Sequence, residues 1–222
     1  MGTPAKLQGP DYLRSGLKRS LDVVVSGPAA AVSLPIMATL GTVILAQDNH
    51  WPFLDAGVEN LATGQATHVW KVRTMIPNAK LLEAQVAKGK PLHQFKLTEK
   101  DPRVTRAGRI IRATSLDETP QFMNTFLGHL TLVGPRQLST SEWQTYALPN
   151  QYTSPYKELF EMFQQGLKFG VTGLYTVLGR SQNLTMEERI GLEVMYGERA
   201  SFAADLKLLA LTVPTVLKMQ GR

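Results

Sequence analysis

The sequence predicts a mostly helical α/β protein with short strands, attached to a membrane by one segment near its N-terminus. Three features point to this fold. Residues 21–46 are apolar apart from Asp22 at their edge. Residues 68–75 alternate partly, which is typical of a strand that leads into a polar loop. The patterns of residues 186–199 and 202–219 predict two helices at the C-terminal end.

Composition limits the class of protein. The chain has 222 residues, 43% hydrophobic and 19% charged, so it is long enough for a packed core and too apolar for wholesale disorder. It has no cysteine, which excludes a disulfide scaffold, a cysteine-ligated metal site and a thiol nucleophile. The net charge of +6 indicates an anionic partner, such as a phosphate-bearing ligand, nucleic acid or acidic lipid.

The apolar run is long enough to cross a bilayer, which takes about 20 residues. It contains Pro28 and Pro35, and a proline inside a helix removes a backbone donor and bends the helix. Ser33 is placed to bond to a carbonyl that Pro35 frees. We therefore expect a proline-broken re-entrant helix, which leaves the membrane by the face it entered, in preference to a straight span.

A cleaved signal peptide is an alternative for the same segment, because Lys18 and Arg19 precede it. The run is longer than the usual apolar region of a signal peptide, about 7–15 residues, and residues 44–46 lack a small-x-small cleavage pattern. The positive-inside rule places the N-terminus in the cytoplasm, because basic residues stand before the run and not directly after it. If the segment re-enters, the rest of the chain is cytoplasmic as well.

Further short elements are expected after the apolar run. Residues 79–88 are typical of a short helix that ends before Gly89 and Pro91. Residues 202–219 are strongly apolar, but charges interrupt them and leave no stretch long enough to span. Two interpretations stay open for this segment: a core helix, or a helix in the membrane interface whose lysines reach toward headgroups.

The residues that carry chemistry gather in 101–122. Arginines recur there at every third position, which spreads them over about half of a helix circumference: Arg103, Arg106, Arg109 and Arg112. A solvated charged face is the common meaning of such a run. Here only Asp101 lies near enough in sequence to offset the charge, so the run also suits a multiply charged anion such as pyrophosphate.

Two adjacent carboxylates, Asp117 and Glu118, follow these arginines. Ser115 and Glu118 have the spacing of a capping box, and residues 119–120 (TP) are an alternative helix start. At a helix start beside arginines, both carboxylates are expected to be ionised. An ionised carboxylate at a phosphate site can act as a nucleophile or as a ligand of a hard cation, so capping and catalysis both stay open.

Two glycine-containing turns add to the basic character. Residues 132–136 (LVGPR) are typical of a strand end followed by a rigid turn that presents Arg136. Residues 170–173 (GVTG) permit a close approach of the backbone to an anion, with Lys168 before them and Arg180 after them. A single G-x-x-G more often marks a plain turn.

Taken together, these segments resemble the bacterial sugar transferases, the monotopic phosphoglycosyl transferases that start lipid-linked glycan and exopolysaccharide assembly. The resemblance covers about residues 18–219 in one order. It is carried by KRSLD (18–22) at the start of an apolar run with a proline, KVRTM (71–75), DPRVTRAGR (101–109), SLDETPQ (115–121) and LVGPR (132–136).

The resemblance implies transfer of a phosphosugar from a UDP-sugar to a polyprenol phosphate (undecaprenyl phosphate), with release of UMP. It implies that Asp117 attacks the sugar-bearing phosphate and forms a covalent intermediate. Glu118 is expected to assist Mg²⁺ binding and proton management, so that both carboxylates are expected Mg²⁺ ligands. Arg112 and Arg136 are expected to hold the phosphates and the nucleotide. Further substrate-binding residues are expected at Arg73, Arg103, Lys168 and Arg180.

The implied organisation has a tail (1–17), a membrane re-entrant helix (18–46) and a catalytic domain (47–222) on the cytoplasmic face of the inner membrane. The expected partners are a UDP-sugar, a polyprenol phosphate and membrane lipid, without nucleic acid, and a homodimer is one option. The chain departs from the family pattern at Gln137, Phe169, Thr176 and Glu193, where the family usually has Pro, Pro, Gln and Asp. These departures bear on the shape of the nucleotide site and on substrate choice.

The alternative function is a membrane-anchored basic module that binds anionic lipid or nucleic acid without catalysis. It accounts for the net charge and the arginines. It does not account for two carboxylates inside a basic cluster, which repel phosphate unless a metal or covalent chemistry is involved.

Overall fold

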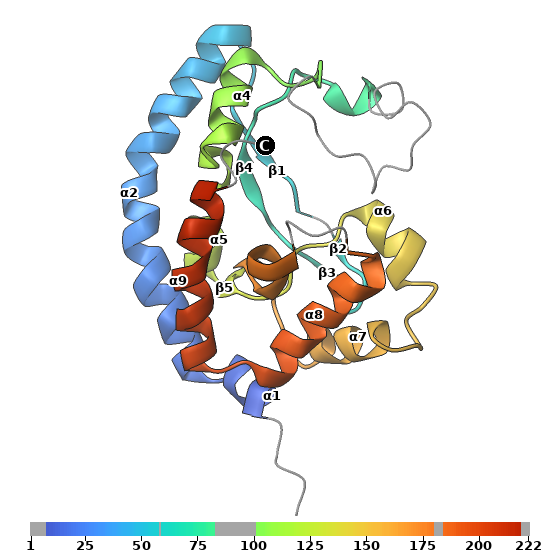
Figure 1. The fold of residues 1–222 in the computed structure, drawn as a ribbon. Helices are drawn as coiled ribbons and strands as arrows, with labels where there is room; N and C mark the ends of the chain where they lie inside the picture. The colour runs from blue at the N-terminus through green and yellow to red at the C-terminus, as the bar shows by residue number, and fades with distance from the viewer. Residues whose placement is uncertain (1–7, 58, 83–100, 180–183, 219–222) are drawn as a thin grey trace, which may run out of the picture.

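The computed structural model describes residues 8–57, 59–82, 101–179 and 184–218, and within these ranges it is mostly helical with short strands, as predicted (Figure 1). The helices are α1 (Gln8–Leu13), α2 (Gly16–Asp48), α4 (Arg106–Ala113), α5 (Gln121–Leu127), α6 (Thr140–Glu142), α7 (Tyr156–Gln164), α8 (Met186–Arg199) and α9 (Phe202–Lys218). The strands are β1 (Phe53–Asp55), β2 (Glu59–Asn60), β3 (Gln65–Ala66), β4 (Trp70–Val72), β5 (Thr131–Val133) and β6 (Gly170–Thr172). Short 3-10 or π-helical turns are η1 (Ala79–Leu82), η3 (Leu116–Glu118), η4 (Trp143–Ala147) and η5 (Tyr175–Gly179).

The described strands form two-stranded ribbons and not one wide sheet. β1 pairs with β4 and β2 pairs with β3, both antiparallel. β5 runs parallel to β6, with Thr131 opposite Gly170 and Val133 opposite Thr172. This parallel pair brings the turn at the end of β5 (LVGPR) beside the segment GVTG, and the paired residues are 39 positions apart in the chain.

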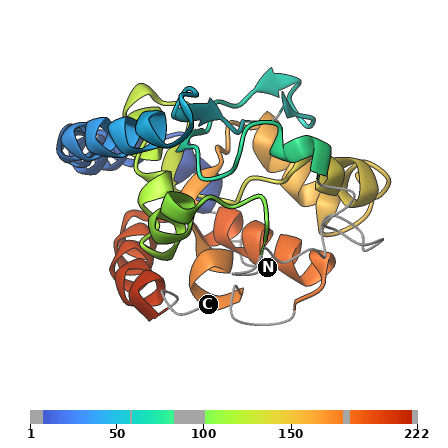
Figure 2. The same cartoon turned by 90° about the horizontal axis from the view of Figure 1, so that it is seen from above.

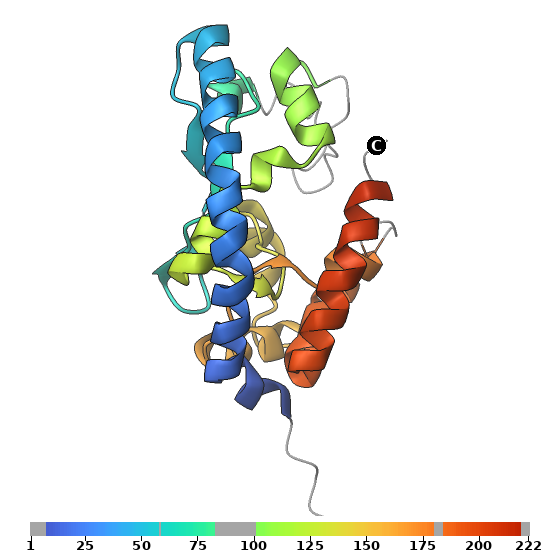
Figure 3. The same ribbon diagram turned by 90° about the vertical axis from the view of Figure 1, so that its left-hand side faces the viewer.

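α2 is one continuous helix of 33 residues, about 50 Å long, although Pro28 and Pro35 lie inside it (Figure 3). The expected break at a proline is therefore not present. Both prolines are exposed and lie on one side of the helix, while buried residues follow the other side from Leu21 to Ile44. Buried residues in both halves of α2 pack against the rest of the protein, and the helix follows a bow without a break (Figure 1). Ser33 donates to Ala30 O (2.7 Å) and not to the carbonyl that Pro35 frees.

The first turn of α2 is fixed by a buried polar network. Lys18 is 4% exposed, and its Nζ lies 2.6 Å from Asp205 Oδ2 of α9 and 2.8 Å from Val133 O of β5. Asp22 accepts hydrogen bonds from the Thr131 hydroxyl and the Leu132 amide. Lys18 and Asp22, at the start of the apolar run, therefore join α2 to both β5 and α9.

Arg19 also has a structural partner. Its guanidinium donates to the carbonyls of Thr125 (2.7 Å) and Phe126 (2.6 Å), in the last turn of α5. A cation at a helix C-terminus satisfies unpaired carbonyls and the helix dipole. Lys18 and Arg19 thus have roles inside the fold besides any role in membrane orientation.

The far end of α2 is held by a second ion pair. Arg73, just after β4, lies 2.6 Å from Asp48 at the last turn of the helix and also donates to the carbonyls of Trp51 and His50. Both ends of α2 are therefore bonded to the same folded unit. Of the helices in the described ranges, α2 is the one long and apolar enough to cross a membrane.

The two C-terminal helices agree closely with the expected 186–199 and 202–219. α9 is in part the core helix of the first interpretation, because Asp205 and Leu208 are buried in the core. Leu206 and Val213 are 45% and 60% exposed, and the membrane-interface interpretation stays a prediction. Seen from above, α2 and α9 lie on one side of the molecule with α4 and α5 between them (Figure 2). The main core lies behind them, where Trp143, Phe160 and Phe163 pack in one cluster with residues of β5 and α8.

Candidate active site

Asp117 and Glu118 lie on the 3-10 turn η3, which joins α4 to α5. Ser115 adopts a left-handed backbone conformation (φ 55°) and forms no side-chain capping bond, and α5 begins only at Gln121. The capping-box interpretation of these residues is therefore wrong. Neither carboxylate is therefore used by a capping box. The left-handed conformation of Ser115 turns the chain at the start of η3.

Glu118 is paired with a residue that the sequence analysis quoted but did not select. Its Oε1 lies 3.3 Å from Nζ of Lys71 in β4. β4 and η3 pack together, so the strand places this lysine beside the carboxylate pair. No local pattern relates these two residues, because 47 positions separate them.

The surroundings of Asp117 act on the pKa of its carboxyl in opposite directions. Burial raises the pKa of its carboxyl, the neighbouring Glu118 raises it further, and Lys71 and Arg112 oppose these effects without overcoming them. The arginine part of the expectation is confirmed, because the charges of Arg112 and Lys71 favour the ionised form, but burial of the side chain beside a second carboxylate outweighs them and the pKa lies above its usual value. Ionisation of Asp117 at neutral pH stays a prediction.

Arg112 lies at the end of α4 on the same side as the carboxylates. Its Nε donates to the hydroxyl of Thr74 (2.7 Å), and its charge acts on Asp117. Arg112 is thus a predicted arginine whose charge does act on Asp117. Arg106 and Arg109 are exposed on α4, and Arg103 is 4% exposed and bound to Asp101 (2.8 Å).

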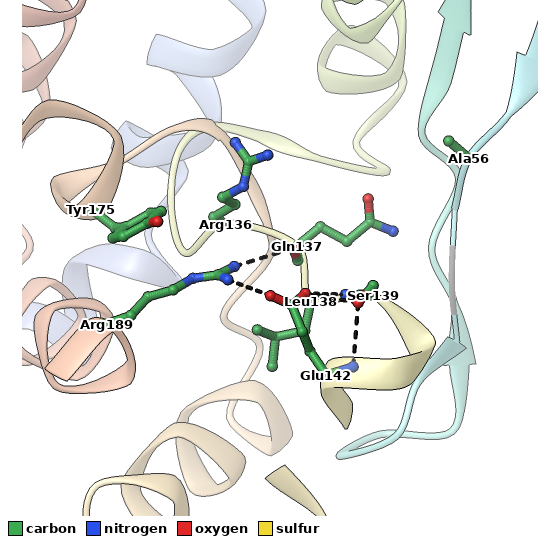
Figure 4. A pocket seen from close by; sticks show the side chains of 8 residues that line it. All are labelled: Ala56, Arg136, Gln137, Leu138, Ser139, Glu142, Tyr175 and Arg189. Atoms are coloured by element: carbon green, nitrogen blue, oxygen red, sulfur yellow. Dashed lines mark hydrogen bonds and ion pairs between the residues drawn. The ribbon is translucent and has the colours of Figure 1, made fainter. Parts of the chain in front are cut away.

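A cavity of about 80 Å³ brings Lys71, Glu118 and Arg136 together above apolar residues that include Leu130 and Phe169. A larger one of about 360 Å³ adjoins it (Figure 4). Arg136 and Gln137 line both cavities. The larger one is completed by Ala56, Leu138, Ser139, Glu142, Tyr175 and Arg189.

Three expected substrate-binding residues do not join this group. The guanidinium of Arg73 is bound to Asp48, and that of Arg103 is bound to Asp101, so both have structural partners. Lys168 donates to Gly128 O (2.7 Å) beyond the end of α5, beside a different cavity that Arg14 and Arg19 also line. Arg180 lies outside the described residues.

The GVTG segment serves backbone packing. A Cβ at Gly170 would collide with Gly134 N, and a Cβ at Gly173 would collide with Gly134 O. Gly134 N donates to Thr172 O (2.9 Å) and Gly170 N donates to Pro135 O (2.8 Å). The glycines therefore allow two turns to touch. Gly170 and Val171 also line the cavity that holds Glu118 and Arg136, so the approach of an anion to this segment stays a prediction.

Two residues of α8 contact the lining of the larger cavity: Arg189 lines it, and Glu193 is bonded to Arg136, which also lines it. Glu193 Oε1 accepts the backbone N–H of Arg136 (2.9 Å), and Arg189 donates to Glu142 Oε1 (2.6 Å) and lies over the ring of Tyr175. The sequence analysis noted Glu193 only as a departure from a family pattern and did not mention Arg189. No signal in the local sequence links these residues to a turn more than 50 positions earlier.

The donor set of η3 is compatible with Mg²⁺. In the part of the chain that the structure describes, no three His, Cys, Asp or Glu side chains form a metal cluster. Mg²⁺ does not require one, because it keeps several waters and binds through one or two carboxylates plus substrate phosphates. Asp117 and Glu118 supply such carboxylates next to a cavity lined by Lys71 and Arg136.

The chain is similar to known proteins over most of its length. The family model of the bacterial sugar transferases matches residues 13–219. A UDP-galactose-lipid carrier transferase of Erwinia amylovora is 32% identical over 92% of this chain and 41% of its own length. A UDP-glucose:undecaprenyl-phosphate glucose-1-phosphate transferase of Klebsiella pneumoniae is 31% identical over 88% of this chain and 39% of its own.

The chain thus spans about two fifths of the length of those two relatives. It covers 87% of the exopolysaccharide production protein ExoY of Sinorhizobium fredii, at 28% identity. The order of motifs, the carboxylate pair beside Lys71 and Arg112, and the match over residues 13–219 agree with one another. The chain belongs to the bacterial sugar transferase family.

Proposed function

We propose that this protein transfers a phosphosugar from a UDP-sugar to undecaprenyl phosphate at a membrane, as an early step of exopolysaccharide or related glycan assembly. The observation that carries the proposal is the Asp117–Glu118 pair with Lys71, Arg112 and Arg136 around it. The relatives are named as a UDP-galactose-lipid carrier transferase, a UDP-glucose:undecaprenyl-phosphate glucose-1-phosphate transferase and an undecaprenyl-phosphate galactose phosphotransferase. These names support the same class of reaction.

The proposed reaction has two displacements at phosphorus. A carboxylate oxygen of Asp117 attacks the sugar-bearing phosphate, the bond from that phosphorus to the bridging oxygen breaks, and UMP leaves with that oxygen. A phosphate oxygen of the polyprenol phosphate then attacks the same phosphorus, and the bond to Asp117 breaks. The second step regenerates the carboxylate and leaves a polyprenol diphosphate sugar, so no oxidant or further reactant is needed.

The chain's own residues have distinct roles in these steps. Arg112 and Lys71 favour the ionised form of Asp117 against the effect of burial, and Arg136 presents its charge to the phosphates in the cavity. Glu118, held by Lys71, lies next to the nucleophile where it can share a proton or a cation. Mg²⁺, bound by Asp117 and Glu118, would neutralise negative charge on the phosphates.

The attachment of α2 supports a monotopic arrangement. Its first turn is bonded to Asp205 and its last turn to Arg73, so a transverse span with its ends on opposite sides of a bilayer would have to break one of these ion pairs. We therefore propose that both ends of α2 face the cytoplasm and that its exposed apolar side contacts lipid. Exposed apolar residues of α2 include Val24, Val32, Leu34 and Val43.

The test is UMP release by the detergent-solubilised protein with undecaprenyl phosphate, Mg²⁺ and a panel of UDP-sugars. We expect release with at least one sugar, none from Asp117→Asn, and loss on chelation of the cation. Arg112→Ala should lose at least tenfold in kcat/KM, while Arg109→Ala, an equal charge change on the exposed side of the same helix, should retain activity. Equal activity of all variants would refute the site, and no release with any sugar would favour the non-catalytic basic module.

A further inference from the structure

Arg136 and Gln137 form a turn that lines both cavities, and each side of this turn is bonded to a different element. Before the turn, Gly134 N donates to Thr172 O and Pro135 O accepts from Gly170 N. After the turn, Ser139 N donates to Glu142 Oε2 (2.7 Å) in the capping box of α6. Arg136 and Gln137 lie between these two bonded segments.

Those two residues are held by side chains of α8. Glu193 Oε1 accepts the N–H of Arg136 (2.9 Å), and Arg189 donates to the carbonyl of Gln137 (3.5 Å). Arg189 and Glu193 are four residues apart, so they project from the same face of the helix. The pair therefore accepts a hydrogen bond from the N–H of Arg136, the first residue of the turn, and donates one to the carbonyl of Gln137, the second.

The position of α8 is itself fixed. Thr185 and Glu188 form a capping box, with Thr185 N donating to Glu188 Oε2 (2.7 Å), which sets where the helix begins. Arg189 is then held by Glu142 (2.6 Å) and by the Tyr175 ring, 4.8 Å from its guanidinium carbon (Figure 4). Arg189 is thus part of the wall of the larger cavity.

We propose that Arg189 and Glu193 are a positioning pair, which sets the backbone of the Arg136–Gln137 turn and so presents Arg136 to the UDP-sugar. This inference rests on the proposed function. Glu193 is 1% exposed, and its Oε2 has no hydrogen-bond partner among the described residues. A carboxyl buried for packing alone would be less favourable than an apolar side chain, so its single bond to Arg136 N is the feature that explains its presence.

The test compares Glu193→Gln, which keeps an oxygen acceptor for the Arg136 amide, with Glu193→Leu, which removes it at similar volume. Glu187→Leu, on the exposed first turn of α8, is the matched control. The readouts are the KM for the UDP-sugar, the KM for undecaprenyl phosphate, kcat, and amide hydrogen exchange of the peptide that contains residues 134–138.

We expect Glu193→Leu to raise the KM for the UDP-sugar at least tenfold, to leave the KM for undecaprenyl phosphate unchanged, and to speed exchange of residues 134–138 at least tenfold. Glu193→Gln should restore both properties to within about threefold of the wild type, and the control should change neither. A merely structural residue would lower the active fraction with both KM values unchanged and speed exchange throughout the chain, and that result would overturn the proposal.

The two proposals fail in different ways. If the wild type transfers no phosphosugar, the proposed function fails, but the hydrogen-exchange comparison still reports on the pair. If the wild type is active and Glu193→Leu leaves both exchange in 134–138 and the KM for the UDP-sugar unchanged, the positioning pair is refuted and the proposed function stands.

Discussion

Glu193→Gln should change the pH dependence of stability. Burial raises the pKa of the Glu193 carboxyl from 4.5 to about 7, although the Arg136 amide and the charges of Arg189 and Arg136 act in the opposite direction. The folded protein therefore holds this proton more tightly than the unfolded chain does. The stabilisation linked to the proton is fully present below pH 4.5 and is lost as the pH rises through about 7.

The size of the effect follows from the shift. A change of one pKa unit corresponds to about 1.4 kcal/mol, so the rise from 4.5 to about 7 corresponds to about 3 kcal/mol of unfolding free energy. Glutamine does not titrate and keeps an acceptor for the Arg136 amide. The variant should therefore resemble the wild type in acid and be more stable than it by about 3 kcal/mol above neutral pH, or roughly 6–12 °C in Tm for a chain of this size.

The assay is thermal unfolding of both proteins in the same detergent at closely spaced pH values from 4 to 8.5, with Glu187→Gln as the control for a surface charge on the same helix. The informative quantity is the difference in Tm between variant and wild type as a function of pH. A difference that stays constant across this range would refute the reasoning, because it would mean that Glu193 does not change its protonation between the folded and unfolded states in that interval.

Three further predictions concern the nucleophile, the anchor and the turns. Because burial and Glu118 raise the pKa of Asp117, the transfer rate should rise with pH through a midpoint above the ordinary value of 3.8. Glu118→Gln should lower that midpoint. A pH–rate profile of UMP release that is flat, or that has the same midpoint in the variant, would contradict this prediction. Lys18→Met leaves the fully buried Asp205 without its cation, so we expect it to lower the free energy of unfolding by about 3–5 kcal/mol. The double variant Lys18→Met with Asp205→Leu should recover much of this loss, as measured by thermal unfolding. Additive losses from the two substitutions would show that the residues are not coupled. Gly170→Ala places a Cβ against Gly134 N and should lower the free energy of unfolding by about 1–3 kcal/mol. Gly191→Ala, at a position with open space around it, should not lower it. Equal Tm values for the two variants would refute the close packing of these turns.

Local patterns correctly predicted the helices at the C-terminal end and the strand end in LVGPR, which is the end of β5. The expected segments 186–199 and 202–219 correspond to α8 and α9, because amphipathic spacing and a capping residue act within a few positions. The same reasoning found the Asp117–Glu118 pair and Arg112, which lie within seven residues of one another. It was less successful for Ser115, whose left-handed backbone conformation replaces the expected capping box.

The prolines of α2 show a different limit. Each would bend an isolated helix, so a break was a reasonable expectation from the sequence. In the folded protein, packing of the buried residues in both halves of α2 and ion pairs at Lys18 and Asp48 hold the helix continuous. The contribution of the partners Asp205 and Arg73 cannot be judged from the apolar run itself.

The sequence by itself determined that this protein has one long apolar segment, a surplus of basic charge and a carboxylate pair among arginines, in the order found in the bacterial sugar transferases. Only the tertiary structure decided which basic residues lie at the carboxylates. Lys71 and Arg136 do, whereas Arg73, Arg103 and Lys168 are bound elsewhere. The physical reason is that an ion pair depends on distance in space, and long-range packing alone brings β4, η3 and the turn before α6 together, with α8 behind them.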